Sequence, residues 1–270
     1  MASAGPYATA DVDDRVLRVR LNRPDRLNAV SDELYADLEA VLERAAAAGD
    51  EVGAVLLTGE GRAFCAGADL KAHASGRRTA AQRRAYVWAG QRVCRLLQTM
   101  DKPVVAAVHG YAIGAGAEIA LSADVVICAQ DAQLRFPEIG LGTFVGGGVT
   151  ARLPALVGQA RAKHLLLLGR PLSGTEAEAW GLVARAVPAD ELATESAALA
   201  GDLAELPRTS LRLVKTALTR AETASTDEAL AFEAEALLAC MDTSDWDSGV
   251  RSFSSERSFS SERPAPGGTP

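Results

Sequence analysis

Three segments of the chain combine small residues with groups that could stabilise or transfer charge. Residues 61–70 and 109–118 are rich in glycine and alanine, and each follows an apolar run. A ligand could approach such a backbone closely and accept hydrogen bonds from free amides. The second segment ends in Glu118, and residues 134–142 place Glu138 between apolar neighbours. Two carboxylates beside free amides are suited to general acid and base chemistry next to an oxyanion.

Each segment also has an ordinary structural interpretation. Residues 61–70 could be a tight turn between a strand and a helix. Either glutamate, taken singly, is better explained as a structural carboxylate paired with an arginine such as Arg135 or Arg152. Residues 109–118 lack the G-x-G-x-x-G spacing of dinucleotide-binding loops and do not open the first strand-helix unit, which argues against a Rossmann site.

Strands and helices alternate through the first part of the sequence. A helix is predicted to begin after the N-cap Ser31 and another to cover Thr79–Met100. From about Gln159 the pattern becomes almost wholly helical, with a break at Pro207, so we expect an α/β fold with a helical C-terminal region. Strands are predicted over Val16–Leu21, Val52–Thr58, Val104–Val108 and Val125–Ala129.

Composition excludes several classes of function. The net charge of −7 and the aromatic content of 5% argue against nucleic-acid binding. No apolar stretch approaches the roughly 20 residues that span a bilayer. Residues 1–14 lack the pattern of a signal peptide, so a cytoplasmic location is expected. The histidines form no motif and the cysteines no pair with metal-ligand spacing, so we expect no metal site. The cysteines are Cys65, Cys94, Cys128 and Cys240.

Taken together, the segments resemble the enoyl-CoA hydratase/isomerase family, the crotonase superfamily. The resemblance runs from Leu21 through Val250 and implies an α/β, crotonase-like ββα spiral with a helical C-terminal trimerisation region. The matching segments, in chain order, are Leu21–Val30, Ala63–Lys71, Ile113–Glu118, Phe136–Glu138, Gly142–Gly148 and Ser173–Leu182.

On this resemblance the chain divides into four parts: a flexible N-terminus (1–14), a ββα spiral core (15–200), a helical C-terminal region (201–257) and a disordered tail (258–270). The hexapeptide Ser-Phe-Ser-Ser-Glu-Arg occurs twice in tandem near the end. Either Phe253 or Phe259 could therefore take the aromatic position of the family's last helix.

The resemblance also implies a mechanism. The backbone amides of Ala68 and Ala115 would form an oxyanion hole for a thioester oxygen. Glu118 would activate water for attack at the β-carbon, and Glu138 would exchange a proton at the α-carbon. Gly146 would lie beside the catalytic water.

Further residues are expected to bind the rest of an acyl-CoA. Arg26 and Lys71 could supply positive charge for its phosphates, and the alternative is that both are solvated surface residues. The residues implied for coenzyme A are Arg26, Ala66, Asp69, Leu70 and Lys71. The residues expected in the acyl pocket are Trp88, Phe136 and Val145, each of which could instead be part of the core.

The favoured function is therefore hydration of a 2-enoyl-CoA thioester. Alternatives with the same site are double-bond isomerisation and a pathway-specific dehydration, and a more distant one is a non-catalytic binding protein of the same fold. No cofactor is expected, since coenzyme A is part of the substrate. The expected assembly is a homotrimer or a dimer of trimers, with no nucleic-acid or membrane partner.

Overall fold

The chain folds into two compact units, Met1–Leu206 and Pro207–Pro270. The computed structural model describes residues 5–74, 76, 78–221 and 224–260. The boundary expected after residue 200 falls inside α7 (Leu192–Glu205), which packs on the main sheet. Because Ala200 and Ala204 of this helix are buried in the core, the division comes after Leu206 instead.

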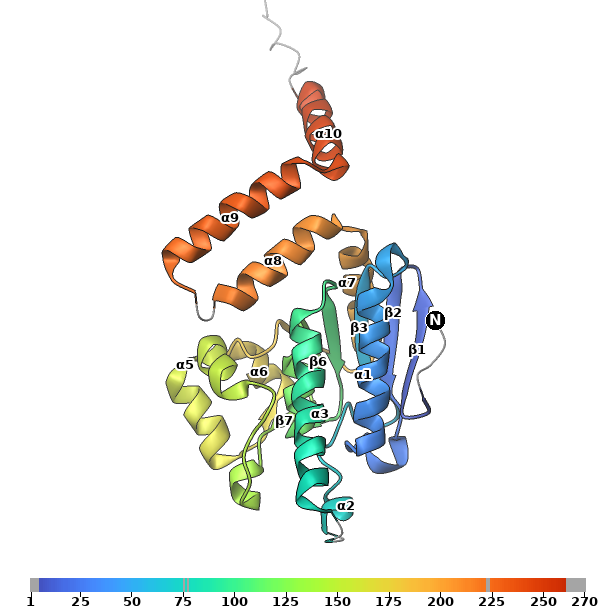
Figure 1. The fold of residues 1–270 in the computed structure, drawn as a ribbon, viewed down its shortest axis with the longest axis vertical. Coiled ribbons are helices and arrows are strands. Elements are labelled where there is room, and N and C mark those ends of the chain that lie inside the picture. The colour runs from blue at the N-terminus through green and yellow to red at the C-terminus, as the bar shows by residue number, and fades with distance from the viewer. Residues whose placement is uncertain (1–4, 75, 77, 222–223, 261–270) are drawn as a thin grey trace, which may run out of the picture. The chain divides into compact units, whose positions relative to one another are not determined.

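In the described part of the chain, six strands form the main sheet (Figure 1). In sheet order they are β1 (Ala8–Asp13), β2 (Val16–Leu21), β3 (Ala54–Gly59), β4 (Val104–Val108), β6 (Val125–Ala129) and β9 (Arg185–Val187). β1 is antiparallel to β2, and the other neighbours are parallel. β4 is buried along its whole length, which explains the continuous apolar sequence of this central strand.

A smaller sheet lies beside the residues of chemical interest. It consists of β5 (Tyr111–Ile113), β7 (Gln133–Arg135) and β8 (Leu172–Ser173), in that order. β5 leads directly into α4 (Ala115–Leu121), and β7 leads into the short helix η3 (Glu138–Leu141). Because β5 and β7 pair in parallel, the segments that follow them emerge at the same edge of this sheet.

Helices cover both faces of the main sheet (Figure 1). α1 (Asp32–Ala47) packs on β1 and β2, while α7 packs on β3, β4 and β6 from the other side. α3 (Ala80–Thr99) packs against α1 and α4. The predicted N-cap of α1 is confirmed, since the Ser31 side chain accepts a hydrogen bond from Leu34 N–H. Within the described residues, the remaining α-helices of this unit are α2 (Leu70–Ala74), α5 (Val149–Leu168) and α6 (Gly174–Ala179), and short 3-10 helices cover Pro24–Arg26 and Gly49–Glu51.

The structure differs from the sequence-based prediction at both ends of the core. Residues 8–13, predicted to lie in a flexible N-terminus, form β1 because every one of them pairs with β2. Residues 1–4 of that segment lie outside the described part. The region after Gln159, predicted to be almost wholly helical, contains β8 and β9, and β9 completes the main sheet beside β6. These strands have two and three residues, too few for a recognisable alternation.

The second unit consists of α8 (Arg208–Ala221), α9 (Thr226–Met241) and α10 (Ser244–Ser260). α9 contacts both other helices. The last turn of α10 includes residues 258–260, which were predicted to belong to a disordered tail, and residues 261–270 lie outside the described part. Among the residues that the structure describes, the helices are too short or too polar to cross a membrane.

Candidate active site

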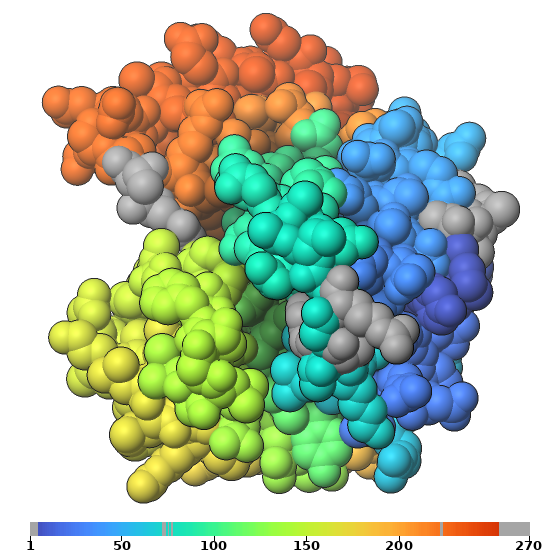
Figure 2. Space-filling view, turned by 60° about the horizontal axis from the view of Figure 1, so that its bottom comes forward, coloured from blue at the N-terminus to red at the C-terminus, as the bar shows by residue number. Residues whose placement is uncertain are grey.

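One face of the first unit is hollowed between α3 and the segment that follows η3 (Figure 2). The hollow opens into a cavity of about 760 Å³. Its walls come from the two loops rich in glycine and alanine, one face of α3, Tyr35 of α1, and parts of residues 137–147. Both Glu118 and Glu138 line it. The structure therefore brings the three chemically interesting segments together around one space.

Two unpaired backbone amides border this cavity. Ala68 and Ala115 both line it, and within the described residues neither backbone N–H donates to an acceptor. Ala115 is the first residue of α4, where the helix offers its N–H no intrahelical partner. A β-carbon on Gly67 would lie 3.8 Å from Ala115 N, so the two loops are in contact. Together they can present two donors to one oxygen atom.

Backbone hydrogen bonds fix both loops in place. Gly67 C=O accepts from Val30 N–H at 2.7 Å, and Asp69 N–H donates to Val30 C=O at 3.0 Å. These bonds immobilise Ala68 from both sides. Ile113 N–H donates to Cys65 C=O at 3.0 Å, which ties the second loop to the first. The donors are therefore held before a ligand arrives, which is the condition for electrostatic stabilisation of an oxyanion.

An ion pair stabilises the first loop, at residues 61–70. The Asp69 carboxylate lies 3.1 Å from Arg23 Nη2, and both side chains are mostly buried. Arg23 Nη1 also donates to Ala29 C=O, and its guanidinium stacks over the Tyr7 ring at 5.6 Å. Sequence reasoning missed Arg23, although this residue lies within the segment Leu21–Val30 that resembles the family. Asp69, which the resemblance assigned to coenzyme A, thus forms an ion pair within the protein.

Glu118 lies on α4, one turn after Ala115, and points into the cavity wall beside Gly146. Its Oε1 accepts a hydrogen bond of 2.6 Å from Gly146 N–H. Burial raises the pKa of the Glu118 carboxyl to about 7, the hydrogen bond from Gly146 opposes this rise, and the charge of Glu138 adds to it. A carboxyl with such a pKa can exchange protons near neutral pH.

Glu138 is the first residue of η3 and is 8% exposed. Within the described residues its Oε2 is buried without a hydrogen-bond partner, while its own backbone N–H interacts with the carboxylate. Burial raises the pKa of this carboxyl, and the backbone hydrogen bond counters the rise. An unsatisfied buried carboxyl oxygen in a cavity wall is costly without a ligand or a proton.

Two glycines let the carboxylates approach the loops. Gly114 caps α4 with φ 53° and ψ −119°, a conformation that strains any other residue. A β-carbon there would lie 2.5 Å from Glu138 Oε1. A β-carbon on Gly146 would lie 2.9 Å from Glu118 Oε2. The absence of side chains at both positions therefore leaves room for the glutamates.

Comparison with known proteins agrees with this geometry. Residues 11–263 match the enoyl-CoA hydratase/isomerase family. The chain belongs to this family. Among its relatives are a short-chain-enoyl-CoA hydratase of Clostridium acetobutylicum, 35% identical over 91% of this chain and 93% of the relative, and a 1,2-epoxyphenylacetyl-CoA isomerase of Escherichia coli, 36% identical over 93% and 97%. A solved enoyl-CoA hydratase from Bacillus anthracis superposes with a TM-score of 0.88 at 32% identity, covering 93% of this chain and 96% of that one.

The other residues that the family resemblance assigns to coenzyme A occupy different positions. Ala66 and Leu70 line the cavity, and Leu70 is 55% exposed at its rim. Arg26 and Lys71 are exposed and lie outside the cavity lining. Both basic side chains are therefore in contact with solvent.

The expected acyl pocket is only partly present. Val145 lines the cavity, but Phe136 is 1% exposed and belongs to the core. Trp88 is 52% exposed, lies outside the lining, and stacks with Arg84 instead. Its neighbour Val87 faces the cavity. One residue along a helix turns the side chain by about 100°, which explains the difference.

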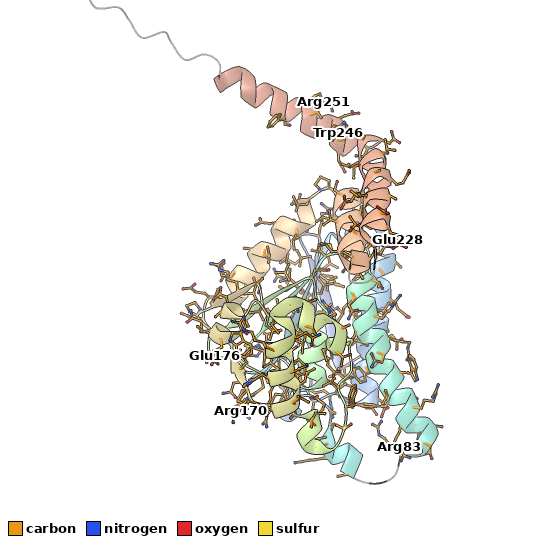
Figure 3. All side chains as sticks on the ribbon, turned by 90° about the vertical axis from the view of Figure 1, so that its left-hand side faces the viewer. Arg83, Arg170, Glu176, Glu228, Trp246 and Arg251 are labelled. Atoms are coloured by element: carbon orange, nitrogen blue, oxygen red, sulfur yellow. The ribbon has the colours of Figure 1, made fainter. Side chains whose placement is uncertain are left out.

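Several lining residues were missed by sequence reasoning. On α3 they recur at helical spacing, so the face was predictable once one member was known. Arg83 lies near the start of this helix (Figure 3). The missed residues that line the cavity include Tyr35, Arg83, Tyr86, Val87, Gln91, Leu141 and Phe144. Among the described residues no cluster of histidine, cysteine, aspartate or glutamate could hold a metal ion.

Proposed function

We propose that this chain is an enoyl-CoA hydratase, which adds water reversibly across the 2,3 double bond of a 2-enoyl-CoA thioester. One observation carries the proposal: a single cavity is bordered by Glu118 and Glu138 and by the free amides of Ala68 and Ala115. The match to a family that includes a short-chain-enoyl-CoA hydratase supports it.

The two amides bind the thioester oxygen. Attack at the β-carbon moves electron density onto this oxygen and forms an enolate. Because the loops are fixed by backbone hydrogen bonds, the amides of Ala68 and Ala115 stabilise this charge without reorganising. Loss of one such donor typically costs about 3 kcal/mol of transition-state stabilisation.

The two glutamates transfer the protons. Ionised Glu118 takes a proton from water as the water oxygen attacks the β-carbon, and protonated Glu138 gives its proton to the α-carbon. Gly146, through its N–H bond to Glu118, keeps that carboxylate aimed at the water. The raised pKa of each carboxyl supports a coupled pair that holds one proton near neutral pH, and the step requires this proton to be on Glu138.

The rest of the substrate lies along the first loop. Ala66 and Leu70 border the cavity and contact the pantetheine end. Asp69 acts through Arg23 by holding this loop. Arg26 and Lys71, both exposed, supply charge for the phosphate groups of coenzyme A. No cofactor takes part.

Crotonyl-CoA turnover tests the proposal. Hydration is followed as the loss of the absorbance of the conjugated thioester, in the wild type and in Glu118→Gln and Glu138→Gln. We expect turnover by the wild type and losses of about 10²-fold or more in each variant. Absence of activity on 2-enoyl thioesters of every chain length, or wild-type rates in both variants, would overturn it.

A second outcome of the same site is isomerisation. The relative named as a 1,2-epoxyphenylacetyl-CoA isomerase favours this alternative, since it matches nearly the whole chain. Mass analysis of the product separates the two functions, because isomerisation leaves the mass of the thioester unchanged and hydration increases it.

The proposed assembly is a homotrimer, or a dimer of trimers, formed through the helical unit. α8 and α9, which the structure describes in full, contain no buried residue. Their exposed apolar side chains need a partner surface. They include Val214, Leu218, Leu230, Leu237 and Leu238.

A further inference from the structure

Besides Arg83 and Tyr86, which hydrogen-bond within the protein, two polar groups lie in the wall that α1 and α3 contribute to the cavity. They are the hydroxyl of Tyr35 and the carboxamide of Gln91. Within the described residues neither group has a hydrogen-bond partner. The opposite wall, at residues 141–145, is mainly apolar, with Leu141, Phe144 and Val145 lining it beside Thr143. The mechanism derived above uses neither polar group.

Gln91 lies close to the reacting carboxylate. The point where a β-carbon on Gly146 would stand is 3.1 Å from Gln91 Nε2 and 2.9 Å from Glu118 Oε2. The carboxamide therefore borders the part of the cavity next to Glu118. Gln98, two turns further along α3, offers a contrast, because its Nε2 donates to Ser122 Oγ at 3.1 Å and to Gly147 C=O at 3.2 Å. The carboxamide of Gln98 is thus used for hydrogen bonds within the protein, whereas the carboxamide of Gln91 is available to a ligand.

Tyr35 reaches the same region through a gap in α3. A β-carbon on Gly90 would lie 2.7 Å from the Tyr35 hydroxyl, so only glycine leaves room for this group. Glycine in the interior of a helix is unfavourable relative to alanine. The neighbouring Tyr86 differs, since its hydroxyl donates to Val30 C=O at 3.3 Å. The loss of helix stability at Gly90 is thus linked to the space that the Tyr35 hydroxyl occupies beside Gln91.

We infer that this wall selects an acyl chain bearing a hydroxyl or carbonyl oxygen within a few carbons of the double bond. The inference rests on the proposed hydratase function and names its substrate class. Gln91 and Tyr35 donate hydrogen bonds to the substituent oxygen, and each can also accept one from a hydroxyl. Both are specificity-determining residues and take no part in proton transfer.

The energetic asymmetry of polar pockets makes this selection strong. A site built to hydrogen-bond a substituent rejects the analogue that lacks it, because its own polar groups are then left unpaired away from water. A plain alkyl chain would displace water from Gln91 and Tyr35 without offering either side chain a hydrogen-bond partner. We therefore expect a preference of at least about tenfold in kcat/KM for the oxygenated chain.

The test compares crotonyl-CoA with 4-hydroxycrotonyl-CoA, which differ by one hydroxyl. The wild type should prefer the hydroxylated thioester. Gln91→Leu should lose about tenfold or more on this substrate and retain or gain activity on crotonyl-CoA, and Tyr35→Phe should show a smaller change in the same direction. Gln133→Leu makes the same chemical change on the exposed face of β7, and should leave both activities unaltered.

Equal preference in the wild type, or equal losses on both substrates in Gln91→Leu, would overturn the inference. A binding experiment keeps it separate from the hydratase proposal. Calorimetry with butyryl-CoA and 4-hydroxybutyryl-CoA, which cannot be hydrated, should show tighter binding of the hydroxylated thioester and loss of that difference in Gln91→Leu. If this difference is present while turnover is absent, the polar wall stands and the proposed reaction fails. If turnover occurs without the difference, the polar wall fails and the proposed reaction stands.

Discussion

At the scale of single residues, the reaction depends on two carboxyls that are difficult to ionise for the same reason. Burial raises the pKa of Glu118 to about 7 and also raises that of Glu138. Their titrations are coupled, so the observable pKa values belong to the pair. One ionised and one protonated glutamate can therefore coexist near neutral pH, which is the arrangement that water addition needs.

The first prediction concerns pH. Hydration requires ionised Glu118, and a carboxyl with a pKa of about 7 is protonated below that pH. The kcat/KM for crotonyl-CoA should therefore fall as pH drops below about 7, by about tenfold per pH unit. In Glu138→Gln the residual activity should keep an acidic limb well above the ordinary pKa of glutamate, because burial is the largest cause of the raised pKa of Glu118.

Glu176→Gln is the matched control for this profile. Glu176 (labelled in Figure 3) caps α6 outside the cavity, and glutamine preserves the capping interaction with Ser173. Its profile should overlay that of the wild type. An acidic limb near the ordinary pKa of glutamate in the wild type would show that Glu118 is not the base.

The second prediction isolates one oxyanion donor. Ala115→Pro removes the N–H at the first position of α4, where proline is tolerated. We expect kcat to fall by about 10²- to 10³-fold with retained secondary structure by circular dichroism. Thr226→Pro makes the same change at the first position of α9 and should keep full activity. A kcat close to wild type in Ala115→Pro would mean that this amide does not hold the thioester oxygen.

At the scale of elements, close backbone approach between loop and helix sets the site. A β-carbon on Gly116 of α4 would lie 2.1 Å from Cys65 C=O, whereas one on Gly201 of α7 would meet nothing within 4 Å. Both glycines are in helices, so alanine is intrinsically favourable at each by about 1 kcal/mol. The close contact with Cys65, in the loop that carries Ala68, distinguishes Gly116 from Gly201.

The third prediction uses this contrast. Gly201→Ala should raise the free energy of unfolding by up to about 1 kcal/mol, measured by urea denaturation. Gly116→Ala should lower it by about 1–3 kcal/mol and reduce kcat, because the overpacked contact displaces the loop that carries Ala68. Equal gains in stability from both substitutions would contradict the close approach of α4 and the loop.

Sequence patterns predicted the longer elements and missed the shorter ones. The strand at Val16–Leu21, the N-cap Ser31 and the helix that became α3 are confirmed, because each has a complete periodic or capping signal. β9 has no such signal at three residues, and its place in the sheet comes from pairing with β6.

The site shows the same division. The backbone loops and glutamates were predicted through their resemblance to a family, since nothing in their spacing places Glu118 opposite Glu138. The acyl wall was predicted poorly because it depends on how α3 is rotated. Trp88 was expected in the acyl pocket, but the rotation of α3 turns Val87 and Gln91 toward the cavity. The periodicity of a helix can be read from a sequence more readily than the rotation of that helix about its axis, which decides which residues face the cavity.

At the scale of the whole molecule, the proposed assembly rests on the exposed apolar side chains of the helical unit. The fourth prediction is that the protein sediments as a trimer or hexamer. Leu237, 59% exposed on α9, should contribute to the subunit contact, so Leu237→Asp should shift the population to smaller species by burying an unpaired charge. A wild-type monomer at micromolar concentration in sedimentation velocity would contradict the assembly.

The most direct test of the central claim is to incubate crotonyl-CoA with the protein in heavy-oxygen water and to analyse the product by mass spectrometry. If Glu118 activates water for attack on the β-carbon, the thioester gains the mass of one labelled water molecule, with the label in a hydroxyl at the β-carbon. Glu118→Gln should form this product far more slowly. A product of unchanged mass, or one without the label at the β-carbon, would contradict hydration by this site.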